Sequence, residues 1–141
     1  MKKYYILFLL SCILLISCGK KEEPKLSTFN PVTYAFKTDQ GWDVQASIQV
    51  KGFTQEKEKD TYIVKMFYTV DLEKPNGKLV KGVVNDTLDE ENTEEFMDLP
   101  INVQFELDSN YTLGKYKVIY NIRDAFSDQQ IKTEKDLELT K

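Results

Sequence analysis

The sequence predicts an all-β protein, a single antiparallel β-sandwich of about seven strands, and three observations lead to this fold class. Apolar and polar side chains alternate in most segments after residue 30, whereas no segment there sustains the 3.6-residue period of a helix. Turn-forming residues separate most of these segments. The only two cysteines of the 141-residue chain, Cys12 and Cys18, precede that region. We therefore expect a core held by packing, without a disulfide.

Residues 1–17 have the organisation of an export signal. Lys2 and Lys3 supply positive charge, and the apolar run that follows, residues 4–16, is too short to cross a bilayer as a helix. The run ends in Leu15-Ile16-Ser17-Cys18, which is similar to the lipobox of bacterial lipoproteins. That resemblance implies cleavage before Cys18, a diacylglyceryl group on its thiol and acylation of the new amine, for example by palmitate. No other cofactor is expected.

The lipoprotein resemblance also implies where the protein resides. Its first partner would be the lipid bilayer, reached through Cys18, in a bacterial cell envelope. Lys21-Glu22-Glu23 looks like the export tag of surface lipoproteins of the Bacteroidota, and a plain solvated tether is the alternative interpretation. Gly19 is compatible with sorting to an outer membrane, facing either the periplasm or the outside. Residues 18–31 are expected to be a lipidated, flexible tether, and residues 32–141 the folded domain.

The alternation assigns seven strands to that domain. We expect them at residues 32–37, 42–51, 62–72, 79–84, 101–108, 116–122 and 130–139. Asn76-Gly77, between the third and fourth of these, favours a tight hairpin. One-sided alternation indicates antiparallel sheets with one covered face. The aromatic residues expected to point into the core are Phe36, Trp42, Tyr62, Tyr68, Phe105, Tyr116 and Tyr120.

The C-terminal third carries a second resemblance. The segment Leu113-Gly114-Lys115-Tyr116-Lys117-Val118, followed by Asp124 and a turn, is similar to the end of bacterial immunoglobulin-like domains. The resemblance implies an immunoglobulin-like sandwich in which Tyr116 is the tyrosine-corner residue, with its hydroxyl bonded to upstream backbone. The chain departs from the antibody pattern at Val118, where antibody domains have a disulfide cysteine. This motif indicates a fold and carries no function.

Three apolar residues fall at strand positions whose side chains are expected to face the solvent. Ile63 and Phe67 alternate with residues expected in the core, and so does Ile119. In an immunoglobulin-like sandwich their strands are neighbours, so the three are expected to form one exposed patch that binds a protein partner of the envelope. Two alternatives would leave no such patch. The tether or a loop could cover these residues, or a bulge could turn them to the other face of the sheet.

The most unusual segment is an acidic one, predicted to be a loop with a helical turn at residues 93–97. Seven carboxylates fall within 13 residues without a basic residue among them: Asp86, Asp89, Glu90, Glu91, Glu94, Glu95 and Asp98. Oxygen donors at this density suit calcium, but the EF-hand spacing is absent. Three interpretations stay open, namely a solvated loop, a calcium or small-ligand site and a docking site for a basic partner.

Composition excludes several functions. The chain has no histidine, which removes Ser-His-Asp and Cys-His catalysis and His-ligated metals. Its formal net charge of −4 and the lack of a basic stripe argue against nucleic-acid binding. We expect no catalytic residues and no metal site with defined ligands. The sequence thus predicts a membrane-anchored, non-catalytic binding or adaptor module, with a calcium- or small-ligand-binding lipoprotein as the alternative.

Overall fold

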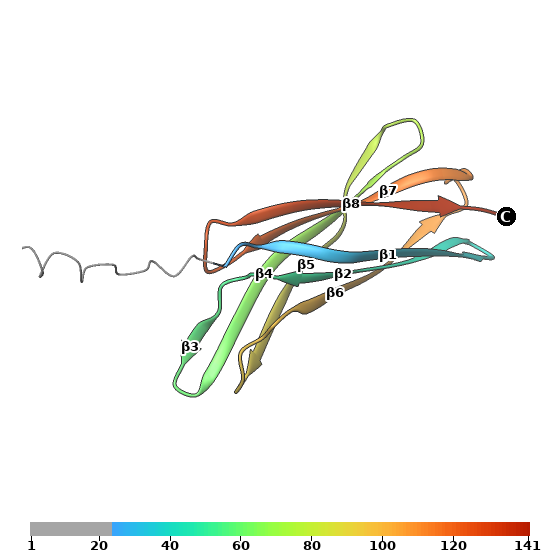
Figure 1. Cartoon of the computed structure of the whole chain (residues 1–141). Coiled ribbons are helices and arrows are strands. Elements are labelled where there is room, and N and C mark those ends of the chain that lie inside the picture. Colours follow the sequence, from blue (N-terminus) through green and yellow to red (C-terminus); the bar gives the residue numbers. More distant parts are fainter. Residues whose placement is uncertain (1–23) are drawn as a thin grey trace, which may run out of the picture.

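The computed structural model describes residues 24–141, which form an all-β antiparallel sandwich (Figure 1). The signal segment, Cys18 and Lys21-Glu22-Glu23 lie outside the described residues, so their assignments stay predictions. The strands are β1 (Ser27–Thr38), β2 (Gly41–Lys51), β3 (Glu56–Glu58), β4 (Thr61–Glu73), β5 (Leu79–Asn92), β6 (Leu99–Asp108), β7 (Gly114–Asp124) and β8 (Gln130–Leu139). All seven predicted strands are present, and β3 is the additional one. No helix in this part of the chain is long and apolar enough to cross a membrane.

The strands form two sheets that pack face to face. One has the order β1-β2-β6, and the other has the order β5-β4-β7-β8, with the short β3 also paired to β4. Where β1 meets β8, the hydroxyls of Thr28 and Thr133 lie 2.6 Å apart, and Thr33 Oγ1 donates to the Asp136 carbonyl at 2.6 Å. Figure 1 shows β1 and β8 running side by side. These contacts tie the two sheets together along one edge.

The core follows the predicted alternation in β2, β4, β6 and β7. In β6 every second residue is buried, and the inner faces of β2, β4 and β7 are almost fully covered. Burying these aliphatic and aromatic side chains supplies the main driving force for folding. Of the expected core aromatics, Trp42, Tyr68, Phe105, Tyr116 and Tyr120 are buried and Tyr62 is partly buried. Phe36 is the exception and is exposed.

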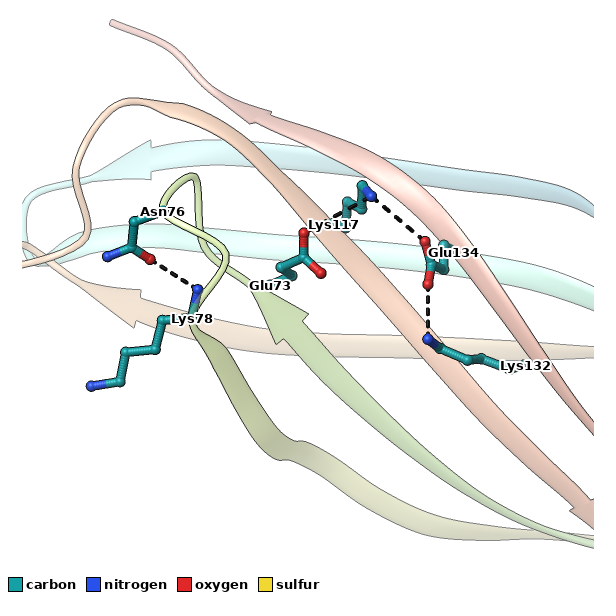
Figure 2. A network of polar contacts seen from close by, with 6 residues as sticks. All are labelled: Glu73, Asn76, Lys78, Lys117, Lys132 and Glu134. Atoms are coloured by element: carbon teal, nitrogen blue, oxygen red, sulfur yellow. Dashed lines mark hydrogen bonds and ion pairs between the residues drawn. The ribbon is translucent and has the colours of Figure 1, made fainter.

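Two predicted local features are confirmed. The Tyr116 hydroxyl donates to the Thr112 carbonyl at 2.7 Å, as a tyrosine corner requires. At the β4–β5 hairpin, Gly77 has a φ of 79° and its amide donates to the Lys74 carbonyl at 2.8 Å. The Asn76 side-chain oxygen accepts from the Lys78 amide at 3.0 Å (Figure 2). Glycine tolerates this φ, which explains why the hairpin turns here.

The folded domain begins earlier than predicted, so the expected tether boundary at residue 31 is wrong. Leu26 is buried against the core and β1 starts one residue later. The Gln129 side chain accepts from the Leu26 amide at 2.8 Å and donates to the Pro24 carbonyl at 2.9 Å. The polar composition of residues 19–25 concealed this attachment, because a single apolar residue gives no periodic signal.

A β-bulge in β1 overturns the prediction that Phe36 is a core residue. Phe29 pairs with Gln49 and Val32 pairs with Ser47, so β1 gains one residue relative to β2 at Asn30-Pro31. Asn30 has a φ of 50°, a conformation that asparagine tolerates better than most residues. Because side chains alternate with a period of two, one inserted residue exchanges the faces of the strand. Phe36 consequently points outward and is 52% exposed.

Candidate functional site

The predicted apolar patch lies on the outer face of the β5-β4-β7-β8 sheet, but its members are not contiguous. Ile63 and Phe67 point outward from β4 as expected. Ile119, on β7, pairs with Asp71, so the three positions are spread along the sheet rather than gathered. The polar Lys65 lies between the first two on the same face and forms an ion pair with Asp89 at 2.8 Å. Phe67 is thus the main exposed apolar member, with 37% of its surface accessible.

Ile119 faces outward and is nevertheless buried, with 3% of its surface exposed, so its assignment to an exposed patch is wrong. Its cross-strand partners are Asp71 and Glu134. Lys117, on the same face of β7, reaches Glu134 at 3.7 Å and Glu73 at 3.9 Å. We attribute the burial of Ile119 to the aliphatic stems of these long side chains, which lie over the sheet while their charged ends reach water.

Figure 2 shows the charged network that Glu73, Lys117, Lys132 and Glu134 form on this face. Lys132 donates to Glu134 at 2.9 Å within β8, and Lys117 extends the network to β4. The hydrogen bond from Lys132, together with its charge, lowers the pKa of Glu134, and the same contact raises the pKa of Lys132. Both groups are solvent-exposed, so the network arranges this surface more than it stabilises the fold.

Phe67 has a partner that the sequence pattern does not predict. Arg123, the only arginine of the chain, pairs with Phe67 across β4 and β7. Its guanidinium carbon lies 4.9 Å from the centroid of the Phe67 ring, within the range of a cation–π contact. The two residues are 56 positions apart in the sequence, and only the register of the two strands brings them together. The outer face of this sheet thus carries an aromatic ring and a guanidinium in direct contact.

The acidic segment is not the loop that was predicted. β5 continues to Asn92, so Asp86, Asp89, Glu90 and Glu91 belong to a sheet-edge strand, and no helical turn forms at residues 93–97. Only the last three acidic residues, Glu94, Glu95 and Asp98, lie in the connection to β6. Strand formation is favoured here because β4 supplies partners for the backbone, while the edge position leaves the carboxylates in water.

The strand geometry also separates the carboxylates. Asp89 and Glu91 pair with outward-facing residues of β4, whereas Asp86 and Glu90 pair with inward-facing ones. Asp86 accepts from the Tyr68 hydroxyl at 3.5 Å, and burial together with the nearby Asp86 charge raises the pKa of Tyr68. Within residues 24–141, no three acidic, cysteine or histidine side chains form a group that could hold a metal ion. The calcium alternative gains no support from this arrangement.

The bulge in β1 creates an exposed aromatic pair on the opposite sheet. Tyr34 is 59% exposed and Phe36 is 52% exposed, and their ring centroids lie 6.5 Å apart. The alternation of side chains predicts Phe36 in the core and gives no reason to single out Tyr34. The available signal was Pro31, because proline within a strand marks an edge or a bulge.

No protein-family model matches the chain, and no curated protein is similar to it. Among solved structures, it is similar to a crystal structure of a protein from Archaeoglobus fulgidus. The two are 13% identical, the match covers 82% of this chain and 98% of that chain, and the TM-score is 0.36. A likeness at this level supports no conclusion about function.

Proposed function

We propose that this protein is a lipid-anchored component of a bacterial cell envelope and acts as a non-catalytic binding or adaptor module with a protein partner. The lipobox at residues 15–18 supports the anchor on Cys18, and Gly19 fits an outer-membrane location. The chain is attached to the folded domain from Pro24 onward, because the Pro24 carbonyl accepts a hydrogen bond from Gln129. The residues between Cys18 and Pro24 span at most about 22 Å, so the anchor would keep the domain close to the bilayer.

An immunoglobulin-like sandwich is part of this proposal. The division of the strands into β1-β2-β6 and β5-β4-β7-β8 supports it, and so does the hydrogen bond between Tyr116 and Thr112. Such a sandwich presents broad sheet faces to the solvent, and these faces are where the module would bind.

One observation carries the protein-binding surface, namely the Phe67 ring beneath the Arg123 guanidinium on the outer face of β4 and β7. Aromatic residues and arginine are enriched at the centres of protein interfaces, where their large side chains bury extensive contact area. Ile63 lies on the same face and extends the surface along β4. Ile119 is covered and takes no part.

Site-specific crosslinking in living cells tests this surface. A photo-crosslinking benzoylphenylalanine in place of Phe67 should capture one envelope protein as a discrete adduct, and Arg123→Ser should reduce the yield. The matched control carries the same group at Ser109, an exposed position between β6 and β7. Equal adducts from both positions, or none from position 67, would show that this face binds no partner. Phe67→Lys should leave the thermal midpoint almost unchanged, since a core residue would give a large loss.

A further inference from the structure

The outer face of the β1-β2-β6 sheet carries a second surface that the proposed function does not use. The residues on it are aligned in rows by the register of the three strands. One row is Tyr34–Gln45–Gln104 and the next is Val32–Ser47–Asn102. Adjacent strands are about 4.8 Å apart, so each row spans about 10 Å from the aromatic edge to β6.

The exposure of the aromatic edge is a specific consequence of the bulge at Asn30-Pro31. Without the inserted residue, Val32, Tyr34 and Phe36 would face the core, and Thr33 and Ala35 would face the solvent. The chain instead directs its larger apolar side chains outward and its smaller ones inward, against the ordinary hydrophobic preference. Bulges often change the direction of side chains near functional sites, and this bulge directs an aromatic pair toward the solvent.

A shallow hollow, open to the solvent, lies beside Tyr34. Its volume is about 350 Å³, and Val32, Tyr34, Gln45, Ser47, Asn102 and Gln104 contribute to its lining. Volumes of this size are at the lower end of those found for small-molecule sites. The hollow therefore combines one aromatic wall with a lining of carboxamides and a hydroxyl.

The polar groups around the hollow are mostly neutral and can both donate and accept. Each of the carboxamides of Gln45, Asn102 and Gln104 offers an acceptor oxygen beside two donor hydrogens. The Gln104 amide nitrogen lies 2.9 and 3.0 Å from the two carboxylate oxygens of Asp43, which holds that carboxamide in place. No lysine or arginine stands in either row, and Asp43 lies next to them. This charge distribution disfavours phosphates, sulfates and uronates.

From these features we infer that this face binds a neutral glycan. The apolar C–H face of a hexopyranose ring would lie against Tyr34 and Phe36, as apolar groups do on aromatic rings. Its hydroxyl groups, each both donor and acceptor, would pair with the carboxamides of β2 and β6. A protein interface would instead place an apolar, desolvated centre where this face has amides.

Affinity electrophoresis of the full-length chain in a neutral detergent tests the inference. The gels contain hydroxyethylcellulose, laminarin, galactomannan, arabinoxylan or dextran as neutral probes and polygalacturonate as the charged comparator. We expect at least one neutral polysaccharide to slow the protein and polygalacturonate to have no effect. Tyr34→Ala and Phe36→Ala should each weaken that binding about threefold to tenfold, and Asn102→Ala should weaken it measurably.

Phe67→Ala is the matched control, because it removes an exposed aromatic from the other sheet. It should bind the polysaccharide like the unaltered protein, which also separates this inference from the proposed protein partner. No retardation by any neutral probe would overturn the inference, and so would unchanged binding by the Tyr34 and Phe36 variants. Sedimentation equilibrium supplies the remaining outcome: a dimer that Tyr34→Ala dissociates would assign the face to a second copy of the chain and overturn glycan binding.

Discussion

The buried carboxylate of Asp124, at the end of β7, accepts a hydrogen bond from the backbone amide of Thr54 at 2.7 Å, across 70 residues of sequence. The same side chain accepts from the Phe126 amide and the Ser127 hydroxyl, each at 2.9 Å. Asp124 is the one charged residue that is buried among residues 24–141. It therefore joins the segment after β2 to the turn between β7 and β8.

Stability should depend on the ionised form of Asp124. Burial alone would raise the pKa of this carboxyl, but the hydrogen bonds from Thr54, Phe126 and Ser127 outweigh burial and lower it. A lowered pKa in the folded state stabilises the fold above the unfolded-state value of about 3.9, and this contribution is lost as the pH falls through the folded-state pKa. In chemical denaturation experiments from pH 7 down to pH 3, the free energy of unfolding should begin to decline at about pH 4.

Asp124→Asn tests the cause of that decline. The variant should lower the free energy of unfolding at pH 7 by about 2–3 kcal/mol, because an amide is a poor replacement for a carboxylate that accepts several hydrogen bonds. Its stability should also fall less between pH 5 and pH 3. An unchanged acid profile would mean that other carboxyl groups produce the decline.

Two buried tyrosines should respond to loss of the hydroxyl in opposite directions. Tyr116→Phe removes the bond to the Thr112 carbonyl and should lower the free energy of unfolding by about 1 kcal/mol. The Tyr120 hydroxyl is buried without a hydrogen-bond partner among the described residues, and burial raises its pKa. Tyr120→Phe should therefore leave stability unchanged or raise it by about 1 kcal/mol. Urea denaturation of the two variants compares them, and losses of equal size would contradict the assignment.

Gly52 should be much less tolerant of a side chain than Gly82. Both have positive φ, 72° and 63°, so an alanine strains the backbone at either position. A Cβ on Gly52 would overlap the Lys25 carbonyl, whereas a Cβ on Gly82 meets nothing within 4 Å. We expect Gly52→Ala to cost about 3 kcal/mol and Gly82→Ala about 1 kcal/mol. Similar costs in denaturant titrations would show that residues 24–26 are not fixed against β2.

The bulge predicts how substitutions of Asn30 change the stability of the fold. Its φ of 50° is unfavourable for β-branched residues and open to glycine. Asn30→Val should lower the free energy of unfolding by about 1–2 kcal/mol, and Asn30→Gly should change it little. Thermal denaturation compares the two variants. An unchanged stability of Asn30→Val would show that the bulge lies elsewhere in β1.

The alternation of side chains was enough to predict the central strands, and it failed where the chain leaves a strict period of two. β2, β4 and β7 lie between neighbouring strands, and β6 is an edge strand that buries every second residue, so the covered faces of all four impose the pattern directly. In β1 the extra residue at Asn30-Pro31 reversed the faces, and Phe36 was misplaced for that reason. In β5 an edge position allows carboxylates within a strand, a context that β-propensity alone does not include.

The candidate sites depended still more on contacts between distant strands. The outward direction of Phe67 followed from parity, but its contact with Arg123 required the pairing of β4 with β7. Ile119 points outward as predicted, but it is buried rather than exposed. The alternation of side chains predicts only the direction in which a side chain points, whereas its neighbours determine how far it is buried. The row from Tyr34 to Gln104 required three strands in register. No local pattern encodes these relationships.

Attachment of lipid to Cys18 is the central claim, because it places the sandwich at a membrane. The direct measurement is the intact mass of the protein extracted from membranes of bacteria that produce it, followed by sequencing of its N-terminal peptide. If the lipid is attached as proposed, the mature chain starts at Cys18 and carries a diacylglyceryl group, and the Cys18→Ala variant remains unprocessed or soluble. An unmodified Cys18 in the mature protein, or fatty-acid incorporation that persists in Cys18→Ala, would contradict it.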